Sequence, residues 1–160
     1  MIKLEPEIAV KMYSSDMLRA AYTILETKSD SEDAVQDAFL KLLSKKPSFR
    51  DMEHAKAWLL RVTINISKSM LRYRNSHYGG ETDCNTAAED YFEEKNESVL
   101  SAVMKLPQDF RTVVFLYYYE EYSTSEIADI LHCPVSTVTT RLSRARKTLK
   151  TILEGELRNE

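Results

Sequence analysis

The sequence has 160 residues, of which 43% are hydrophobic and 29% charged, and its formal net charge at pH 7 is −3. This composition is typical of a globular protein and excludes a largely disordered chain. No apolar run approaches the ~18 residues that a membrane span requires, and the N-terminus lacks the apolar segment of a signal peptide, so we expect a cytoplasmic protein without membrane insertion.

Two helices are predicted at the start of the chain. The first covers residues 7–26, where apolar side chains recur at helical spacing. Its expected core positions are Ile8, Met12, Leu18, Tyr22 and Leu25. The second begins at Ser29 and Glu32, which have the spacing of a capping box, and ends at Pro47. Its expected core positions are Ala34, Val35, Ala38, Phe39, Leu42 and Leu43.

A long third helix is predicted from about His54 to Arg74, after a short loop with the sequence SFRDME. Its second half is basic and has no acidic residue. The basic side chains there are Arg61, Lys68, Arg72 and Arg74. Asn65, Trp58 and Tyr73 are interleaved with them, a combination that suits unstacked bases beside a nucleic-acid backbone. Burial in a core would explain Trp58 equally well, so both interpretations stay open.

The composition changes after this helix. Residues 77–93 contain Gly79 and Gly80 and small polar residues without apolar periodicity, which predicts a flexible linker. Residues 75–97 hold seven acidic residues and one lysine, so the linker is acidic. We therefore predict two small helical domains, residues 1–76 and 94–160. With only three glycines and four prolines in the chain, we expect an all-α fold.

Four helices are predicted in the second domain. The first reaches Lys105, the second covers Gln108–Glu120, and the third covers Thr124–Leu131 after a second capping box of Ser123 and Glu126. Pro134 stands at the expected first position of the last helix. A stripe at intervals of three and four residues should be buried there: Val135, Val138, Leu142, Ala145, Leu149 and Ile152.

The last two helices have the pattern of a helix-turn-helix, in which a tight turn joins two short helices and the second is amphipathic and basic. Hydroxyl and guanidinium groups on the outer face of the last helix suit base edges and phosphates in a major groove. The residues predicted to contact DNA are Thr137, Thr139, Thr140, Arg141, Ser143, Arg144 and Arg146. A solvated helix face is the alternative, but the caps, the turn and the apolar stripe agree with the helix-turn-helix.

No pattern in the sequence indicates catalysis or metal binding. Cys84 and Cys133 are far apart, and the three histidines are scattered without metal-ligand spacing. The sequence has no Gly-rich phosphate loop, no HExxH motif and no GxSxG motif. We expect neither an enzyme nor a cofactor.

Four segments, in this order and spacing, resemble the bacterial sigma factors of RNA polymerase. DAVQDAF (33–39) and AWLLRVTIN (57–65) resemble region 2, and LPQDFRTVVFL (106–116) and EIADILHCPVSTVTTRLSRARKTL (126–149) resemble region 4. The short chain, with one linker between these regions, is similar to the extracytoplasmic-function (ECF) subgroup of the sigma-70 family. The resemblance implies a factor that initiates transcription at specific promoters, by minus-ten strand capture and minus-thirty-five duplex recognition.

The resemblance also implies roles for residues in the first half. Asp33, Gln36 and Asp37 match positions that dock region 2 onto the clamp helices of core RNA polymerase. Asn65 matches the position that helps capture a flipped base of the minus-ten element, and the loop 49–53 matches the segment that forms the pocket for that base. The residues implied to hold the separated strand are Arg61, Lys68, Arg72 and Arg74.

Further roles follow in the second half. The residues implied to read the minus-thirty-five element are Thr139, Thr140, Arg141, Ser143 and Arg144. The aromatic run 115–119 matches the surface that region 4 presents to the polymerase flap, although we expect Phe115 and Leu116 to be core. Two positions depart from many relatives: His132 replaces a glycine that accepts left-handed geometry, and Thr139 replaces a basic residue. An anti-sigma protein is common in the subgroup, but no residue here identifies one.

Two other functions fit parts of the sequence. A stand-alone helix-turn-helix regulator would use the first half as a sensor or dimerisation domain, but it would have no reason to carry the region 2-like segments. A helical adaptor that binds only proteins would not need the basic last helix.

Overall fold

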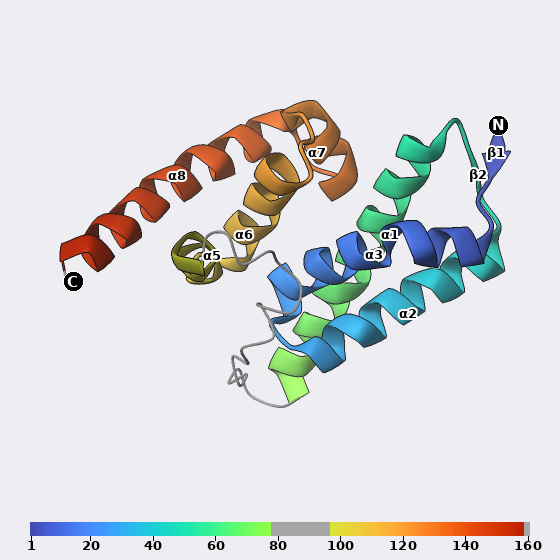
Figure 1. Ribbon diagram of the computed structural model, residues 1–160, viewed down its shortest axis with the longest axis horizontal. Helices are drawn as coiled ribbons and strands as arrows, with labels where there is room; N and C mark the ends of the chain where they lie inside the picture. The colour runs from blue at the N-terminus through green and yellow to red at the C-terminus, as the bar shows by residue number, and fades with distance from the viewer. Residues whose placement is uncertain (78–96, 159–160) are drawn as a thin grey trace. The chain divides into compact units, whose positions relative to one another are not determined.

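The computed structural model describes residues 1–77 and 97–158. The chain divides into two compact units, which cover residues 1–92 and 93–160. Within the described ranges seven of the ten elements are α-helices, and the other three are two strands of two residues each and a π-helical segment of five, which confirms the predicted all-α class (Figure 1). The predicted linker, residues 77–93, falls almost wholly outside the described residues.

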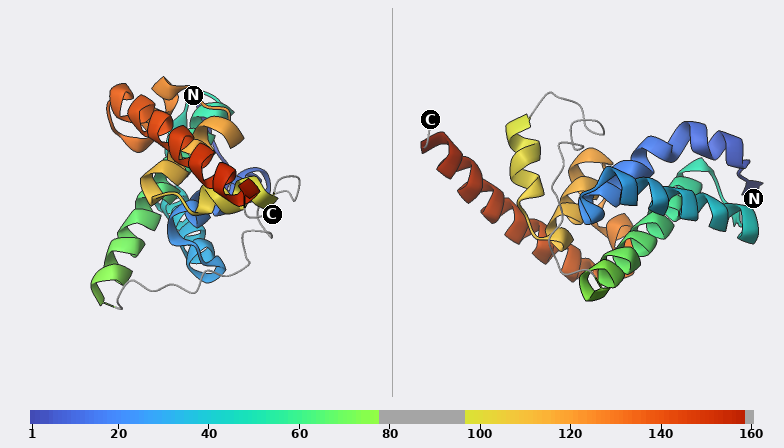
Figure 2. Two further views of the ribbon diagram at one scale, coloured as in Figure 1. Left: turned by 90° about the vertical axis from the view of Figure 1, so that its left-hand side faces the viewer. Right: turned by 90° about the horizontal axis from the view of Figure 1, so that it is seen from below.

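The first unit is built on three helices. Its elements are β1 (Ile2–Lys3), α1 (Pro6–Leu25), α2 (Lys28–Lys45), β2 (Ser48–Phe49) and α3 (Met52–His77). Each helix packs against the other two, and the three lie side by side in Figures 1 and 2. The side chains of Met17, Ile24, Leu59 and Ile64 are fully buried between them.

The buried face of α1 differs from the one predicted. Ile8 and Met12 are 46% and 52% exposed, so their assignment to the core was wrong. The core positions include Ala9, Tyr13 and Met17, which recur at intervals of four residues. The small side chain of Ala9 fixes the phase of the helix even though Ile8 is more hydrophobic. The expected positions Tyr22 and Leu25 are buried.

The start of α2 also differs. Thr27 is its N-cap, and the Thr27 hydroxyl accepts a hydrogen bond from the backbone N–H of Asp30 at 3.3 Å. The predicted capping box at Ser29 and Glu32 was therefore wrong, because the helix already begins at Lys28 and both residues lie inside it. Leu43 was also wrongly assigned to the core and is 49% exposed.

The segment SFRDME, predicted as a loop, contains a short strand and the start of the third helix. Its first two residues form β2, which pairs antiparallel with β1 through Ile2 opposite Phe49 and Lys3 opposite Ser48. Phe49 is buried. The third helix then begins two residues before the predicted start and ends three residues after the predicted end.

The second unit has a helix-turn-helix at its C-terminal side. Its described elements are α5 (Glu97–Met104), α6 (Gln108–Val114), a π-helical segment (Phe115–Tyr119), α7 (Thr124–Leu131) and α8 (Val135–Arg158). The long helix α8 contacts α5, α6 and α7, and in Figure 1 its C-terminal half extends beyond α6 and α7. The predicted helix over 108–120 changes hydrogen-bond pattern at its end, where the Glu120 N–H donates to the Phe115 carbonyl.

The connections of the helix-turn-helix follow the sequence closely. The Ser123 hydroxyl accepts the Glu126 N–H at 3.1 Å and the Glu126 carboxylate accepts the Ser123 N–H at 3.0 Å, which confirms this capping box. His132 has φ 57° and so adopts the left-handed geometry of the turn. Pro134 was predicted as the first residue of the last helix, but α8 begins one residue later, at Val135. The Pro134 carbonyl accepts the N–H of Val138.

The apolar stripe of α8 is buried mainly in its middle. Val138, Leu142 and Ala145 are buried, as predicted. Val135 is 44% exposed, so its assignment to the stripe's buried part was wrong. It lies in the first turn of the helix.

Within residues 1–77 and 97–158, no helix combines the length and the apolar content that a membrane span requires. The same ranges contain no cluster of three or more His, Cys, Asp or Glu side chains that could hold a metal ion. Cys133, at the turn between α7 and α8, is a free thiol.

Candidate nucleic-acid interface

One face of α3 carries a row of polar and basic side chains. Arg61, Asn65, Lys68 and Arg72 follow one another at intervals of four, three and four residues. At ~100° per residue they fall within about 60° of the helix circumference. Arg61, Asn65 and Arg72 are exposed and Lys68 is half-buried. The buried residues of the same helix fall on the other half of its circumference: Ala55, Leu59, Leu60, Thr63, Ile64 and Ser67.

The same spacing continues toward the start of α3. Trp58 and His54 precede Arg61 by three and seven residues, so both share the face of the row, and both are half-buried. The Phe49 ring contacts each of them edge-on, with centroid distances of 5.5 Å to His54 and 5.6 Å to Trp58. The aromatic side chains therefore lie at one end of a basic face, where the loop 49–53 joins the helix.

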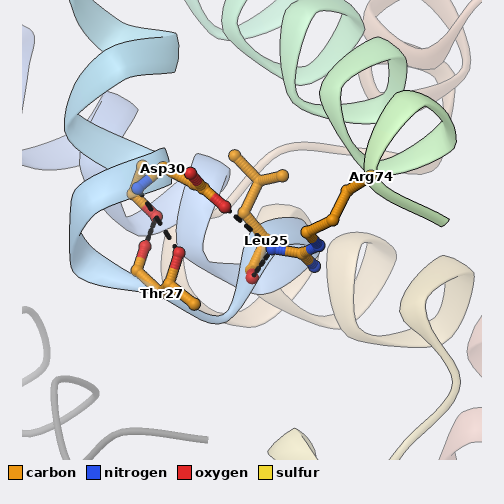
Figure 3. A network of polar contacts seen from close by, with 5 residues as sticks. Leu25, Thr27, Asp30 and Arg74 are labelled. Carbon is orange, nitrogen blue, oxygen red and sulfur yellow. Dashed lines mark hydrogen bonds and ion pairs between the residues drawn. The ribbon is translucent and has the colours of Figure 1, made fainter. Parts of the chain in front are cut away.

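Arg74 has a different environment from the rest of the basic segment (Figure 3). It follows Arg72 by two residues and so points about 200° away around the helix. Its Nη1 donates to the Leu25 carbonyl at 3.1 Å and to the Asp30 carboxylate at 2.9 Å. The guanidinium thus ties α3 to the end of α1 and to the first turn of α2, beside the Thr27 cap. Its Nε is buried and has no hydrogen-bond partner among residues 1–77 and 97–158.

A second exposed face lies on α2. Asp33, Gln36 and Asp37 are all exposed, on the side of the helix away from the buried Val35. Leu40 shares this side and is 54% exposed. Sequence reasoning did not include Leu40, although its phase relative to the buried positions could have revealed it.

The outer face of α8 has its own row. Ser136, Thr140, Ser143 and Lys147 recur at intervals of four, three and four residues, and all are exposed. They lie opposite the buried stripe, as the 3.6-residue period requires. The other predicted DNA contacts flank this row: Thr139 and Arg144 are exposed, and Thr137 and Arg141 are half-buried. Lys147 was not among the predicted contacts, and its place in the row is the signal that identifies it.

Two arginines at the edges of α8 have partners within the second unit. Arg141 lies 3.9 Å from the Asp109 carboxylate of α6. Arg146 donates through Nε to the Tyr118 hydroxyl at 2.6 Å, and its guanidinium carbon lies 5.6 Å from the ring centroids of both Tyr117 and Tyr118. The hydrogen bond that Arg146 donates to the Tyr118 hydroxyl raises the pKa of Arg146, which stays charged.

The aromatic run that contributes Tyr118 is split between core and surface. Phe115 and Leu116 are buried, as predicted, whereas Tyr118 and Tyr119 are 54% and 41% exposed. The π-helical turn over 115–119 thus presents two tyrosines on the surface of the second unit.

Comparisons with known proteins match both units. Residues 9–77 match the family model of sigma-70 region 2, and residues 96–149 match that of sigma-70 region 4. The ECF RNA polymerase sigma factor SigW of Bacillus subtilis is 27% identical over 158 residues, with 88% of this chain and 84% of the relative covered. The ECF RNA polymerase sigma-E factor of Escherichia coli K12 is 31% identical over 137 residues, with 75% and 72% covered.

Two solved structures are also similar. The sigma factor RpoE of Bartonella quintana, crystallised in complex with the anti-sigma factor NepR, superposes with a TM-score of 0.76 at 25% identity, covering 92% of this chain and 96% of that one. CnrH, in complex with the cytosolic domain of CnrY, superposes with a TM-score of 0.68 at 25% identity, covering 94% and 88%.

Two helical units with basic outer rows, one of them a helix-turn-helix, define a DNA-binding protein of two parts. The matches to both regions make the assignment specific: the chain belongs to the sigma-70 family, as an ECF sigma factor. It is therefore a promoter-specific transcription initiation factor, and its partners are core RNA polymerase and promoter DNA. The region 2 match over residues 9–77 also removes the grounds for reading the first half as a sensor domain.

Proposed function

We propose that the two units divide promoter recognition between them, with α3 holding the separated minus-ten strand and α8 reading the minus-thirty-five duplex. The observation that carries this proposal is the single exposed face of α3 that joins Arg61, Asn65, Lys68 and Arg72. Cationic side chains on both sides of a neutral amide suit a strand whose phosphates need charge and whose bases need hydrogen bonds.

Asn65 is the residue proposed to contact a flipped base. Its amide offers both a donor and an acceptor, so it can pair with the hydrogen-bonding edge of a base that has left the stack. Arg61 and Arg72 lie one and two turns away on the same face and would neutralise neighbouring phosphates. Arg74 does not lie on this face, and its guanidinium is hydrogen-bonded to Leu25 and Asp30. Its contact with the strand therefore stays a prediction from the family resemblance.

The α8 row supports the second half of the proposal. The hydroxyls of Thr140 and Ser143 are centred on the exposed face and would reach base edges, whereas Arg144 and Lys147 would bind phosphates. A guanidinium has five N–H donors, so Arg141 and Arg146 can keep their partners within the unit and still bind DNA. Thr137 and Thr139 complete the predicted contact set.

The remaining surfaces are proposed to bind proteins. The α2 face of Asp33, Gln36 and Asp37 would dock onto the clamp helices of core RNA polymerase, with Leu40 adding apolar contact. Tyr118 would contact the flap. The acidic linker over 77–93 would connect the two domains during initiation, which takes place in the cytoplasm. Both similar solved structures are complexes, one of them with a named anti-sigma factor, and we propose a regulator of that class here too.

Replacement of Asn65 with Ala tests the part of the proposal that concerns capture of the minus-ten strand by α3. Losing a base contact should lower promoter opening about tenfold, since such contacts contribute about 1–3 kcal/mol. Opening is measured by permanganate footprinting of the holoenzyme on promoter DNA. The Asn75→Ala variant is the matched control, because Asn75 is an exposed asparagine of the same helix that lies about 15 Å from Asn65 along its axis. Unchanged opening in Asn65→Ala, with normal binding to core polymerase, would remove Asn65 from base capture.

A further inference from the structure

The segment between β2 and α3 is held in place at several points. β1 pairs with β2 and so fixes the chain at Ser48 and Phe49. The Tyr13 hydroxyl donates to the Met52 carbonyl at 3.4 Å. Tyr13 is buried, and this burial raises the pKa of its hydroxyl, which stays protonated as a donor. The exposed turn at Arg50 and Asp51 is thus anchored on both sides.

His54 closes this turn with a reciprocal pair of hydrogen bonds. The Asp51 carboxylate accepts the backbone N–H of His54 at 2.8 Å, and the imidazole Nδ1 of His54 accepts the backbone N–H of Arg50 at 3.1 Å. The arrangement resembles a capping box in which an imidazole replaces the usual carboxylate. Nδ1 can accept this bond only when it carries no proton.

The position of His54 links the turn to the basic row. Its ring lies on the same face of α3 as Trp58, Arg61 and Asn65, and its edge-on partner Phe49 is buried beneath the turn. Any base held near Asn65 would therefore lie along the helix face whose N-terminal end is the His54–Arg50 turn. A fixed backbone at that point would present one shape to the base.

We propose that His54 is a positioning residue, which holds the turn at Arg50 and Asp51 in one conformation and thereby sets the base preference of the minus-ten pocket. This inference rests on the proposed function, because it requires that α3 and the loop 49–53 receive a flipped base. His54 itself acts through the backbone of the turn and needs no contact with DNA.

Two substitutions separate the hydrogen bond of His54 from the packing of its ring. His54→Asn keeps an acceptor near the place of Nδ1 but loses the ring contact with Phe49. His54→Phe keeps an aromatic ring beside Phe49 but has no acceptor for the Arg50 N–H. If the hydrogen bond positions the turn, His54→Asn should match the native protein in Arg50 exchange and base selection, and His54→Phe should not.

The first measurement is hydrogen exchange at the Arg50 amide in the full chain, followed by NMR. Losing one exposed hydrogen bond should accelerate exchange about fivefold in His54→Phe and leave His54→Asn within about twofold of the native rate. Equal exchange in the native protein and in His54→Phe would overturn the positioning role, whatever the DNA results.

The second measurement is base selection by the holoenzyme. A pool of forked templates with a randomised single-stranded minus-ten segment is sequenced before and after capture. The native protein and His54→Asn should enrich the same bases, and His54→Phe should lower that enrichment about fivefold while binding core polymerase normally. Faster Arg50 exchange with unchanged base enrichment would overturn the link between the turn and base choice.

The two readouts also distinguish this inference from the proposed function. If the native holoenzyme enriches no base, or if Asn65→Ala enriches the same bases as the native chain, strand capture by this face fails. In that case the exchange rate of Arg50 still decides whether His54 holds the turn. If Asn65→Ala abolishes enrichment and His54→Phe does not reduce it, only the positioning inference fails.

Discussion

Among the individual residues, Arg74 best illustrates how basic side chains in one segment can differ in role. Its neighbour Arg72 is exposed on the outer row of α3, whereas the Arg74 guanidinium is directed to Leu25 and Asp30. The side chain of Arg74 is only 17% exposed, and that of Asp30 is 34% exposed. A hydrogen-bonded pair with this degree of burial stabilises more than a fully exposed one.

We predict that Arg74→Ala destabilises the chain by about 1–3 kcal/mol, because it removes two charge-assisted hydrogen bonds and leaves Asp30 without this partner. Arg72→Ala, the matched control, should change the free energy of unfolding by less than about 0.5 kcal/mol. Urea denaturation measures the free energy of unfolding of both arginine variants. A double-mutant cycle of Arg74→Ala with Asp30→Asn gives the coupling energy between Arg74 and Asp30, expected near ~1 kcal/mol. Equal stability of the two arginine variants would mean that the Arg74 contacts add little.

At the scale of the elements, the helix-turn-helix depends on its local end signals. The capping box of Ser123 and Glu126 satisfies two backbone N–H groups at the start of α7, and this helix has only eight residues. A short helix has few internal hydrogen bonds, so an end contact is a large share of its stability.

We therefore predict that Ser123→Ala lowers the free energy of unfolding of the second unit by about 1 kcal/mol. Ser125→Ala is the matched control, since Ser125 is an exposed serine of the same helix and should be nearly neutral. Thermal unfolding followed by circular dichroism compares the two variants. A loss of the same size in both would show that helix propensity, not the cap, accounts for the effect.

The elements also explain which predictions from the sequence succeeded. The bounds of α7 were predicted correctly because a cap, a short apolar pattern and a turn residue all mark its ends. At the start of α2 both Thr27 and Ser29 are residue types that cap helices, and the helix uses Thr27 rather than Ser29. In α1 the hydrophobic residues Ile8 and Met12 are exposed, and the face that packs against the other two helices contains Ala9 instead.

The candidate interface was predictable to the extent that it follows helical periodicity. The membership of Asn65 in a basic segment was visible in the sequence, and the 4–3–4 spacing places it with Arg61 and Arg72 on one face. The partners of Arg74 and Arg146 were not predictable, because Asp30 and Tyr118 are 44 and 28 residues away along the chain. Such contacts are set by tertiary packing alone. The proposed role of His54 depends on the conformation of the turn at Arg50 and Asp51, to which its side chain is hydrogen-bonded.

For the whole molecule, the main feature is that basic and acidic side chains lie on different helix faces. The net charge of −3 would oppose binding to DNA if it were spread evenly. Instead, Arg61, Lys68 and Arg72 share the outer face of α3. Arg144 and Lys147 lie on the outer side of α8, and Asp33 and Asp37 lie on α2. The two basic faces can therefore contribute separately to the salt dependence of promoter binding.

This sorting predicts which substitutions change the salt dependence. Each phosphate contact lowers the slope of log K against log salt concentration by about 0.9 units, because it releases condensed counterions. Arg144 is exposed on α8, so Arg144→Ala should reduce the magnitude of the slope by about one unit in holoenzyme binding to upstream duplex DNA. Arg141→Ala should reduce it less, because Asp109 lies 3.9 Å from that guanidinium and already balances part of its charge.

Asn65→Ala provides the contrasting case on the other unit. The amide carries no charge, so its loss should weaken open-complex formation while the salt slope of duplex binding stays unchanged. Filter-binding titrations over a series of salt concentrations compare the salt slopes of duplex binding for the native, Arg144→Ala and Asn65→Ala holoenzymes. If Asn65→Ala changed the slope as much as Arg144→Ala, the two faces would not act independently, and the division of labour between α3 and α8 would have to be abandoned.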